Sequence, residues 1–94
     1  MKIRSVRHRG LKRLLERDDP SGLPQAYLTK IADIAAFPRR IPRVDALRTV
    51  PAWKVHTLSG DRKGTWSVSV SRNWRITFRI DDGEIADLDF EDYH

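Results

Sequence analysis

The chain has 94 residues, a formal net charge of +5 and no cysteine, which excludes disulfides and thiolate metal sites and leaves room for one domain over residues 1–94. The start, MKIRSVRHRG, has no apolar region of the signal-peptide kind, and no segment is long enough to cross a bilayer, so we expect a soluble, cytoplasmic protein. Residues 1–80 carry all 18 Lys and Arg against six acids, a net of +12, whereas residues 81–94 carry seven acids and no Lys or Arg. A basic body of this kind attracts polyanions, and the acidic end either neutralises part of it or supplies carboxylates to a site.

The first part of the chain is predicted to be mainly helical. The opening KIRSV is short and β-branched, which favours a strand. HRGLKRLLER then places Leu11, Leu14 and Leu15 at i, i+3 and i+4, the spacing of a short amphipathic helix, and the turn formers DDPSG end it.

The segment LPQAYLTKIADIAAF predicts a second helix, because Pro24 is tolerated in a first helical turn and Pro38 ends the run. Its apolar stripe consists of Tyr27, Leu28, Ile31, Ile34 and Ala35. Residues 38–52 are rich in proline and arginine and are interpreted as an irregular connection with one helical turn at 44–48.

The last forty residues change to the period of a strand. WSVSVS alternates strictly, which predicts one apolar and one polar face, and WRITFRI alternates in the same way. The residues expected to face the core are Trp66, Val68 and Val70 in the first strand, Trp74, Ile76, Phe78 and Ile80 in the second, and Ala86, Leu88 and Phe90 in the last.

The turn between the last two strands is predicted from the register that it imposes. A two-residue loop would set the core residue Phe78 opposite Asp87, whereas a three-residue loop of residues 81–83 sets Phe78 opposite Ala86. We therefore expect the longer loop. The other pairs of this register are Ile76 with Leu88, Arg75 with Asp89, Thr77 with Asp87, and Tyr93 with Ser71.

Together these elements predict an α+β fold, with a curled antiparallel sheet of four to five strands and two N-terminal helices packed on one side. The three tryptophans, at positions 53, 66 and 74, are expected to help so small a domain to form a core.

No pattern indicates a metal or a cofactor. His8, His56 and His94 lack ligand spacing, and the chain has neither a phosphate-cradling P-loop nor a nucleophile elbow. The polar residues that remain are His56, Arg62 and Lys63 in the segment VHTLSGDRKG, Arg75 on a strand, and Asp92, Tyr93 and His94 at the end.

These groups suffice for metal-independent cleavage of RNA. A general base takes the proton of a ribose 2′-OH, that oxygen attacks the adjacent phosphorus, and a general acid protonates the leaving 5′-oxygen. Cations stabilise the charge that builds on the phosphate. Two histidines, a carboxylate, a tyrosine and an arginine supply every role in this scheme.

Each residue also has a purely structural interpretation. His56 can be an ordinary sheet residue, Arg75 can pair with Asp89 across the sheet, and GDRKG can be a solvated loop. The last two residues can fray, as chain ends do. Composition and pattern alone therefore reach only a small basic α+β domain directed at RNA.

The chain nevertheless resembles the HigB-type toxins of bacterial toxin–antitoxin pairs, within the RelE superfamily. The resemblance runs through IRSVRHRGLKRLLE, VHTLSGDRKGTWSVSV, NWRITFRI and DLDFEDYH, and it is the combination of these segments that is specific. It implies a RelE-like microbial RNase fold and a ribosome-dependent mRNA endoribonuclease, or mRNA interferase, which cuts the codon in the decoding site and arrests growth. It also implies a helix-turn-helix antitoxin as the silencing partner.

The resemblance also implies roles for individual residues. His56 matches the catalytic histidine, Arg75 matches the arginine that stabilises the transition state, and Asp92, Tyr93 and His94 match the terminal catalytic trio. Arg62 and Lys63 fall in the loop that faces RNA. Ser59 stands where the family has a phosphate-holding lysine, so Lys54 or Lys63 must reach that phosphate for full activity.

The sequence leaves open which residue is the base and whether the protein is catalytically active. His94 suits the acid, with either His56 or Asp92 as the base. The alternative function is a catalytically weak or inactive module of the same fold that binds RNA or the antitoxin, and Ser59 is the only hint of it. A DNA-binding regulator is disfavoured, because no helix-turn-helix is recognisable and the basic charge is scattered.

Overall fold

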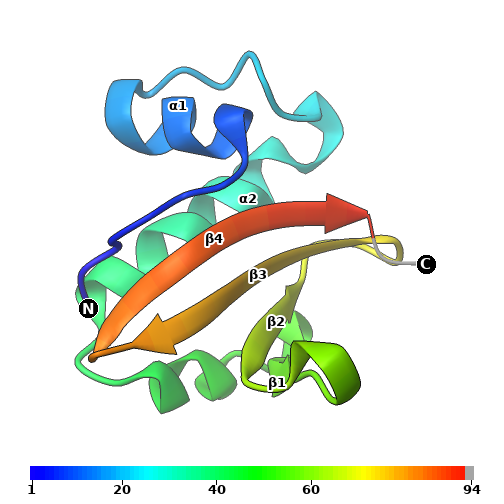
Figure 1. Cartoon of the computed structure of the whole chain (residues 1–94). Coiled ribbons are helices and arrows are strands. Elements are labelled where there is room, and N and C mark those ends of the chain that lie inside the picture. The colour runs from blue at the N-terminus through cyan, green and yellow to red at the C-terminus, as the bar shows by residue number, and fades with distance from the viewer. Residues whose placement is uncertain (93–94) are drawn as a thin grey trace.

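The computed structural model describes residues 1–92, so the predictions made for Tyr93 and His94 lie outside the described residues. These residues form an α+β fold in which helices precede the sheet (Figure 1). The helices are α1 (Arg9–Arg17) and α2 (Leu28–Ala36), and the strands are β1 (His56–Thr57), β2 (Thr65–Ser69), β3 (Trp74–Asp81) and β4 (Glu84–Asp92). The 3₁₀ helices are η1 (Gln25–Tyr27), η2 (Phe37–Arg40), η3 (Val44–Thr49), η4 (Pro51–Trp53) and η5 (Gly60–Arg62).

Within residues 1–92, four antiparallel strands form one sheet in the order β1-β2-β3-β4. Figure 1 shows β3 and β4 as long curving strands, with α2 behind them and α1 beyond the β4 edge. This confirms the predicted fold class with the lower of the two strand counts. Among the described residues, no helix is long and apolar enough to cross a membrane.

Both helices occur where the apolar spacing predicted them. In α1 the fully buried Leu11 faces the core, and the ring of His8 caps the helix because its Nδ1 accepts the Leu11 N–H at 3.2 Å. In α2 the core residues are Ile31, Ile34 and Ala35. A side chain at Gly10 would overlap the backbone of Gly22, so glycine is required where α1 meets the segment that leads to α2.

The opening segment is not a full strand. It lies along the outer edge of β4 and forms two isolated parallel bridges, Ile3 with Ile85 and Val6 with Leu88. Between the bridges, the Oγ of Ser5 accepts the N–H of Asp87 at 2.8 Å. A side chain therefore takes the place of a ladder bond, which explains why the predicted strand is interrupted.

The predicted three-residue loop between β3 and β4 is wrong. Asp81 pairs with Glu84, and the turn consists of Asp82 and Gly83 with φ of 53° and 76°. Two successive left-handed residues are the mark of a type I′ hairpin turn. The objection to this turn was that it would pair Phe78 with Asp87. A β-bulge avoids that pairing, because the register shifts by one residue between Thr77 and Arg79, and Asp87 adopts a φ of 55°.

The bulge changes which residues of β4 face the core. Ile85, rather than Ala86, joins Leu88 and Phe90 in the core, and Ala86 lies opposite Arg79 on the other face. The other predicted pairs that lie within the described residues are corrected as well. The observed pairs are Ile76 with Phe90, Arg75 with Glu91, and Thr77 with Asp89.

The predicted faces of β2 and β3 are confirmed. Val68, Ile76 and Phe78 are almost fully buried, and Trp53 is buried against Phe37 in an edge-to-face contact. The half-buried Trp66 and Trp74 stack on Phe78 and Phe90, so all three tryptophans contribute to the core as expected.

Candidate active site

The face of the sheet that points away from the core is polar, and it carries several of the predicted site residues. Directly opposed residues point to the same face. His56, Ser67, Thr77 and Asp89 are opposed in turn across β1, β2, β3 and β4, and the neighbouring row consists of Ser69, Arg75 and Glu91. The sheet therefore brings His56 and Arg75, which are 19 positions apart in sequence, onto one surface.

The ring of His56 is oriented by the backbone two residues before it. Its Nδ1 lies 2.9 Å from the carbonyl oxygen of Lys54. A carbonyl only accepts, so Nδ1 must carry the proton of the neutral ring, and Nε2 is left with the lone pair. Lys54 itself is exposed and holds a left-handed conformation with φ of 45°, which turns its carbonyl toward the ring. This tautomer is the one in which His56 can accept a proton from another molecule.

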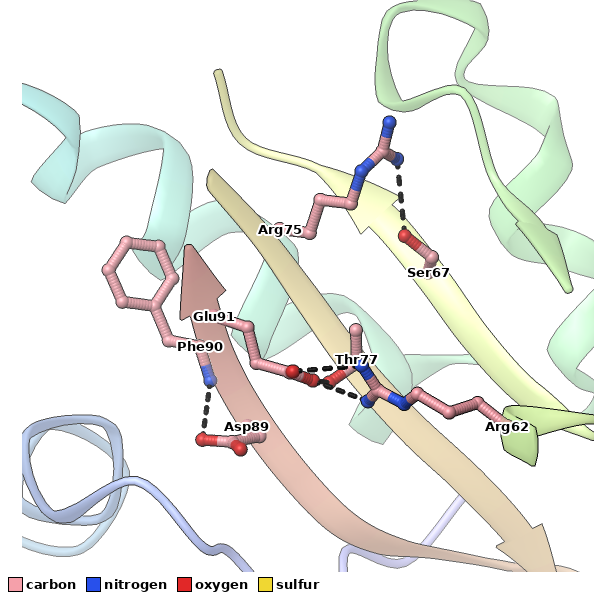
Figure 2. Close-up of polar contacts among 7 residues, drawn as sticks. All are labelled: Arg62, Ser67, Arg75, Thr77, Asp89, Phe90 and Glu91. Atoms are coloured by element: carbon pink, nitrogen blue, oxygen red, sulfur yellow. Dashed lines mark hydrogen bonds and ion pairs between the residues drawn. The ribbon is translucent and has the colours of Figure 1, made fainter. Parts of the chain in front are cut away.

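Arg75 is linked to the strand position of His56 through a shared neighbour, Ser67. Its Nη1 donates to the Oγ of Ser67 at 3.1 Å, and Ser67 is the residue opposite His56 (Figure 2). Ser67 is fully buried, so it is a fixed point between the two side chains. A histidine and a guanidinium on one face of a sheet can serve as a base and as a donor to a phosphate that gains negative charge.

Arg62 reaches over β3 from η5 and binds Glu91 of β4 (Figure 2). Its Nη1 donates to Oε1 at 2.9 Å and its Nη2 to Oε2 at 2.6 Å, and the Oγ1 of Thr77 also donates to Oε2. The hydrogen bonds from Arg62 hold the pKa of Glu91 below its usual value, against the opposing effect of burial, and the bond from Thr77 lowers it further.

Two adjacent grooves flank this ion pair. One, of about 320 Å³, is lined by His56, Thr57, Leu58, Ser59, Asp61 and Arg62. The other, of about 310 Å³, is lined by Arg7, Asp61, Arg62, Lys63, Thr65, Thr77, Phe78, Arg79, Asp87, Asp89 and Glu91. Arg62 borders both grooves, so the predicted basic loop does lie beside His56. Ser59 is exposed in the first groove.

The end of β4 carries the remaining described site residue. Asp92 is exposed and lies opposite Trp74, one pair beyond Arg75 and Glu91. The structure thus brings His56, Arg62, Lys63 and Arg75 to the polar face or to its border, whereas Asp92 lies at the end of β4 on the side of the sheet that carries Trp74. Tyr93 and His94 follow Asp92 outside the described residues.

The acidic end of the chain neutralises part of the basic body, which was one of the two expectations. Glu84 pairs with Lys2 at 3.8 Å and with Arg4 at 3.9 Å, and Asp81 pairs with Arg4 at 2.5 Å. Among residues 1–92, no group of three or more histidines and acids is placed to hold a metal ion.

Sequence reasoning missed the role of Glu91. The residue stood inside the motif EDYH, but the predicted register set Asp89 rather than Glu91 opposite Arg75. The alternation of Asp89 and Glu91 with apolar neighbours did indicate a polar face. Only the bulge at Asp87 decides which of these acids meets which cation.

Two solved structures of bacterial proteins have a similar fold. The YoeB/ParE toxin from Agrobacterium tumefaciens superposes with a TM-score of 0.56 at 20% identity, over 100% of this chain and 99% of that one. YafQ from E. coli strain BL21(DE3) gives 0.53 at 13% identity, over 95% of this chain and 92% of that one. At such identities the likeness concerns the fold, which is that of the RelE-like toxins.

The sequence comparisons are more specific. A family model described as "RelE-like toxin of type II toxin-antitoxin system HigB" matches residues 4–94. A protein of Proteus vulgaris named Endoribonuclease HigB is 38% identical over 97 residues, which cover 98% of this chain and 99% of that protein. The chain therefore belongs to the HigB-like toxins of type II toxin–antitoxin systems, and such a toxin implies an antitoxin partner.

Proposed function

We propose that this chain is an endoribonuclease toxin that enters the ribosome in the bacterial cytoplasm and cuts mRNA in the decoding site. A helix-turn-helix antitoxin then silences it. The observation that carries the proposal is the 38% identity, over almost the whole of both chains, to a protein named as an endoribonuclease. The polar face supports it, since His56 and Arg75 lie there beside the same serine.

The proposed reaction needs no metal. His56, whose Nε2 carries the lone pair, takes the proton of a ribose 2′-OH, and the oxygen attacks the neighbouring phosphorus. Arg75 donates hydrogen bonds to the phosphate oxygens as charge builds on them. His94 gives its proton to the leaving 5′-oxygen, so that a cyclic phosphate and a free hydroxyl are formed, while Asp92 and Tyr93 help to place the scissile phosphate.

Lys54, Arg62 and Lys63 are proposed to bind the RNA backbone. All three side chains are exposed, and Arg62 and Lys63 border the same groove. A guanidinium has five N–H donors, so a bidentate bond with a carboxylate does not by itself prevent Arg62 from contacting a phosphate.

The proposal also accounts for dependence on the ribosome. Among its described catalytic residues, His56 of β1 borders an open groove, while Arg75 of β3 and Asp92 at the end of β4 line neither groove. An RNA strand must therefore be held for in-line attack by something else, and orientation of this kind accounts for a large part of a rate enhancement.

The test is a toeprint on translating ribosomes with the purified protein. Wild type is compared with His56→Ala, with a variant lacking residues 93–94, and with the control Arg43→Ala, which removes one exposed cation outside both grooves. New cuts in the decoding-site codon are expected from wild type and the control. They should weaken about 100-fold or more in the other two variants. A folded wild-type protein that makes no cuts would refute the enzyme and favour the binding module.

A further inference from the structure

We propose that Glu91 is a positioning residue that clamps the basic loop of residues 60–64 onto the last strand and so fixes the approach of the loop to the scissile phosphate. This inference rests on the proposed function. No catalytic role is assigned to Glu91, because it acts through Arg62 and the loop that carries it.

The clamp joins three segments that are distant in sequence. Glu91 accepts two hydrogen bonds from Arg62, which is 29 residues away, and one from Thr77, which is 14 residues away (Figure 2). Thr77 is 2% exposed and belongs to the middle of the sheet. Its hydroxyl therefore fixes the carboxylate of Glu91 to the sheet, and the carboxylate in turn holds the guanidinium of Arg62. A carboxylate fixed at three points defines the position of its partner, which a single surface ion pair does not.

The loop contains one 3₁₀ turn, in which the N–H of Lys63 donates to the carbonyl of Gly60 at 3.1 Å. It is bounded by Gly60 and Gly64, whose φ values of 70° and 90° are left-handed, and no atom beyond the adjoining residues of the chain lies within 4 Å of where a Cβ would be at either position. The bond from the Leu58 N–H to the Thr65 carbonyl closes its base at 2.8 Å. Glycines without packed neighbours allow the loop to swing, and the Arg62–Glu91 pair is placed to stop it.

The charge of Glu91 suits this role. Its pKa is held below the usual glutamate value by the bonds from Arg62, so the carboxylate stays ionised throughout the neutral range. A group that does not titrate near neutrality serves as a fixed counter-charge and not as a proton carrier. Glu91 directly precedes Asp92 in the sequence.

Glu84 offers a matched control on the same strand. It is also half-buried and ion-paired, but its distances to Lys2 and Arg4 are 3.8 and 3.9 Å and it lies at the opposite end of β4. Glu91→Gln and Glu84→Gln change the net charge equally, so any general effect of charge on ribosome binding is the same in both.

The experiment measures single-turnover cleavage on programmed ribosomes, with ribosome affinity measured separately. Glu91→Gln should lower the cleavage rate about 10- to 100-fold, the size expected for misplacement by about 1 Å, and leave the affinity within about twofold of wild type. Glu84→Gln should behave as wild type. The shorter Glu91→Asp keeps the charge and should still lose activity, and an unchanged Glu91→Asp rate would overturn the proposal.

The pH–rate profile separates positioning from proton transfer. In Glu91→Gln its shape should be unchanged while the whole curve is lower. Loss of one limb of the profile would make Glu91 an acid or base and refute the positioning role.

Hydrogen exchange tests the clamp without reference to cleavage. Amides 60–64 should exchange faster in Glu91→Gln than in wild type or Glu84→Gln. Unchanged exchange would refute the clamp, and faster exchange with undiminished cleavage would refute its role in positioning. A wild-type protein that binds ribosomes without cutting would refute the proposed function, while the exchange data would still decide whether the clamp exists.

Discussion

The β-bulge at Asp87 can be tested by substitutions that affect stability in opposite directions at neighbouring positions. Asp87 holds a φ of 55°, whereas Asp89, two residues further along β4, does not have a positive φ. Both side chains are half-buried. Glycine and valine have opposite preferences for the two backbone conformations, so exchanging them at each position reads out the conformation directly.

The magnitude follows from the backbone. A residue with a Cβ pays about 1–2 kcal/mol in the left-handed region, and a β-branched residue is at the upper end or beyond it. Asp87→Val should therefore be about 2 kcal/mol less stable than Asp87→Gly. At position 89 the order reverses, because glycine in a strand costs about 0.5–1 kcal/mol and valine favours a strand.

The assay is thermal or urea unfolding of the four variants beside wild type. For a domain of this size, 1 kcal/mol corresponds to about 4–8 °C in Tm. Asp87→Gly should melt at least about 8 °C above Asp87→Val, whereas Asp89→Gly should melt below Asp89→Val. If valine were the better residue at both positions, β4 would be continuous and the register described here would be wrong.

Three further predictions concern the site. Because the folded pKa of Glu91 lies below its unfolded value, its contribution to stability is present above the unfolded pKa and is lost as the pH falls through the folded pKa. Unfolding titrations should therefore show a stability gap between wild type and Glu91→Gln that is largest above about pH 5 and closes toward pH 3; a gap that widens with acid would contradict the ion pair. Ser59→Lys, which adds a cation to the groove that contains His56, should raise ribosomal cleavage about tenfold, equivalent to one charge contact of about 1.4 kcal/mol, and an unchanged rate would mean that Lys54 or Lys63 already fills the role. Arg75→Ala should slow single-turnover cleavage about 100-fold or more while Arg43→Ala does not, and equal rates in these two variants would remove Arg75 from the site.

Several features follow from the sequence because the signals are local. The spacing of Leu11, Leu14 and Leu15 and the alternation in WSVSVS and WRITFRI decide which side of each element is apolar. Neither depends on how the elements are paired. The fold class, the two helices and the polar face that carries His56 and Arg75 were therefore within reach of the sequence, and the resemblance to the family suggested the roles proposed for these residues.

The register of the last hairpin was not within reach, for a physical reason. A strand has a side-chain period of two, so one additional residue moves every later side chain to the other face. The sequence argument excluded the two-residue turn because it assumed an unbroken ladder. The structure keeps that turn and absorbs the extra residue at Asp87, whose left-handed conformation is supported by the bond from its N–H to Ser5, 82 residues away.

The sequence by itself thus determined the fold, the polar face and the residues offered to the site, since these depend on local periodicity and on motifs read directly along the chain. Only the tertiary structure decided that Glu91, and not Asp89, lies opposite Arg75 and binds Arg62. That choice depends on a one-residue bulge and on a loop brought from 29 positions away, and no local pattern encodes either.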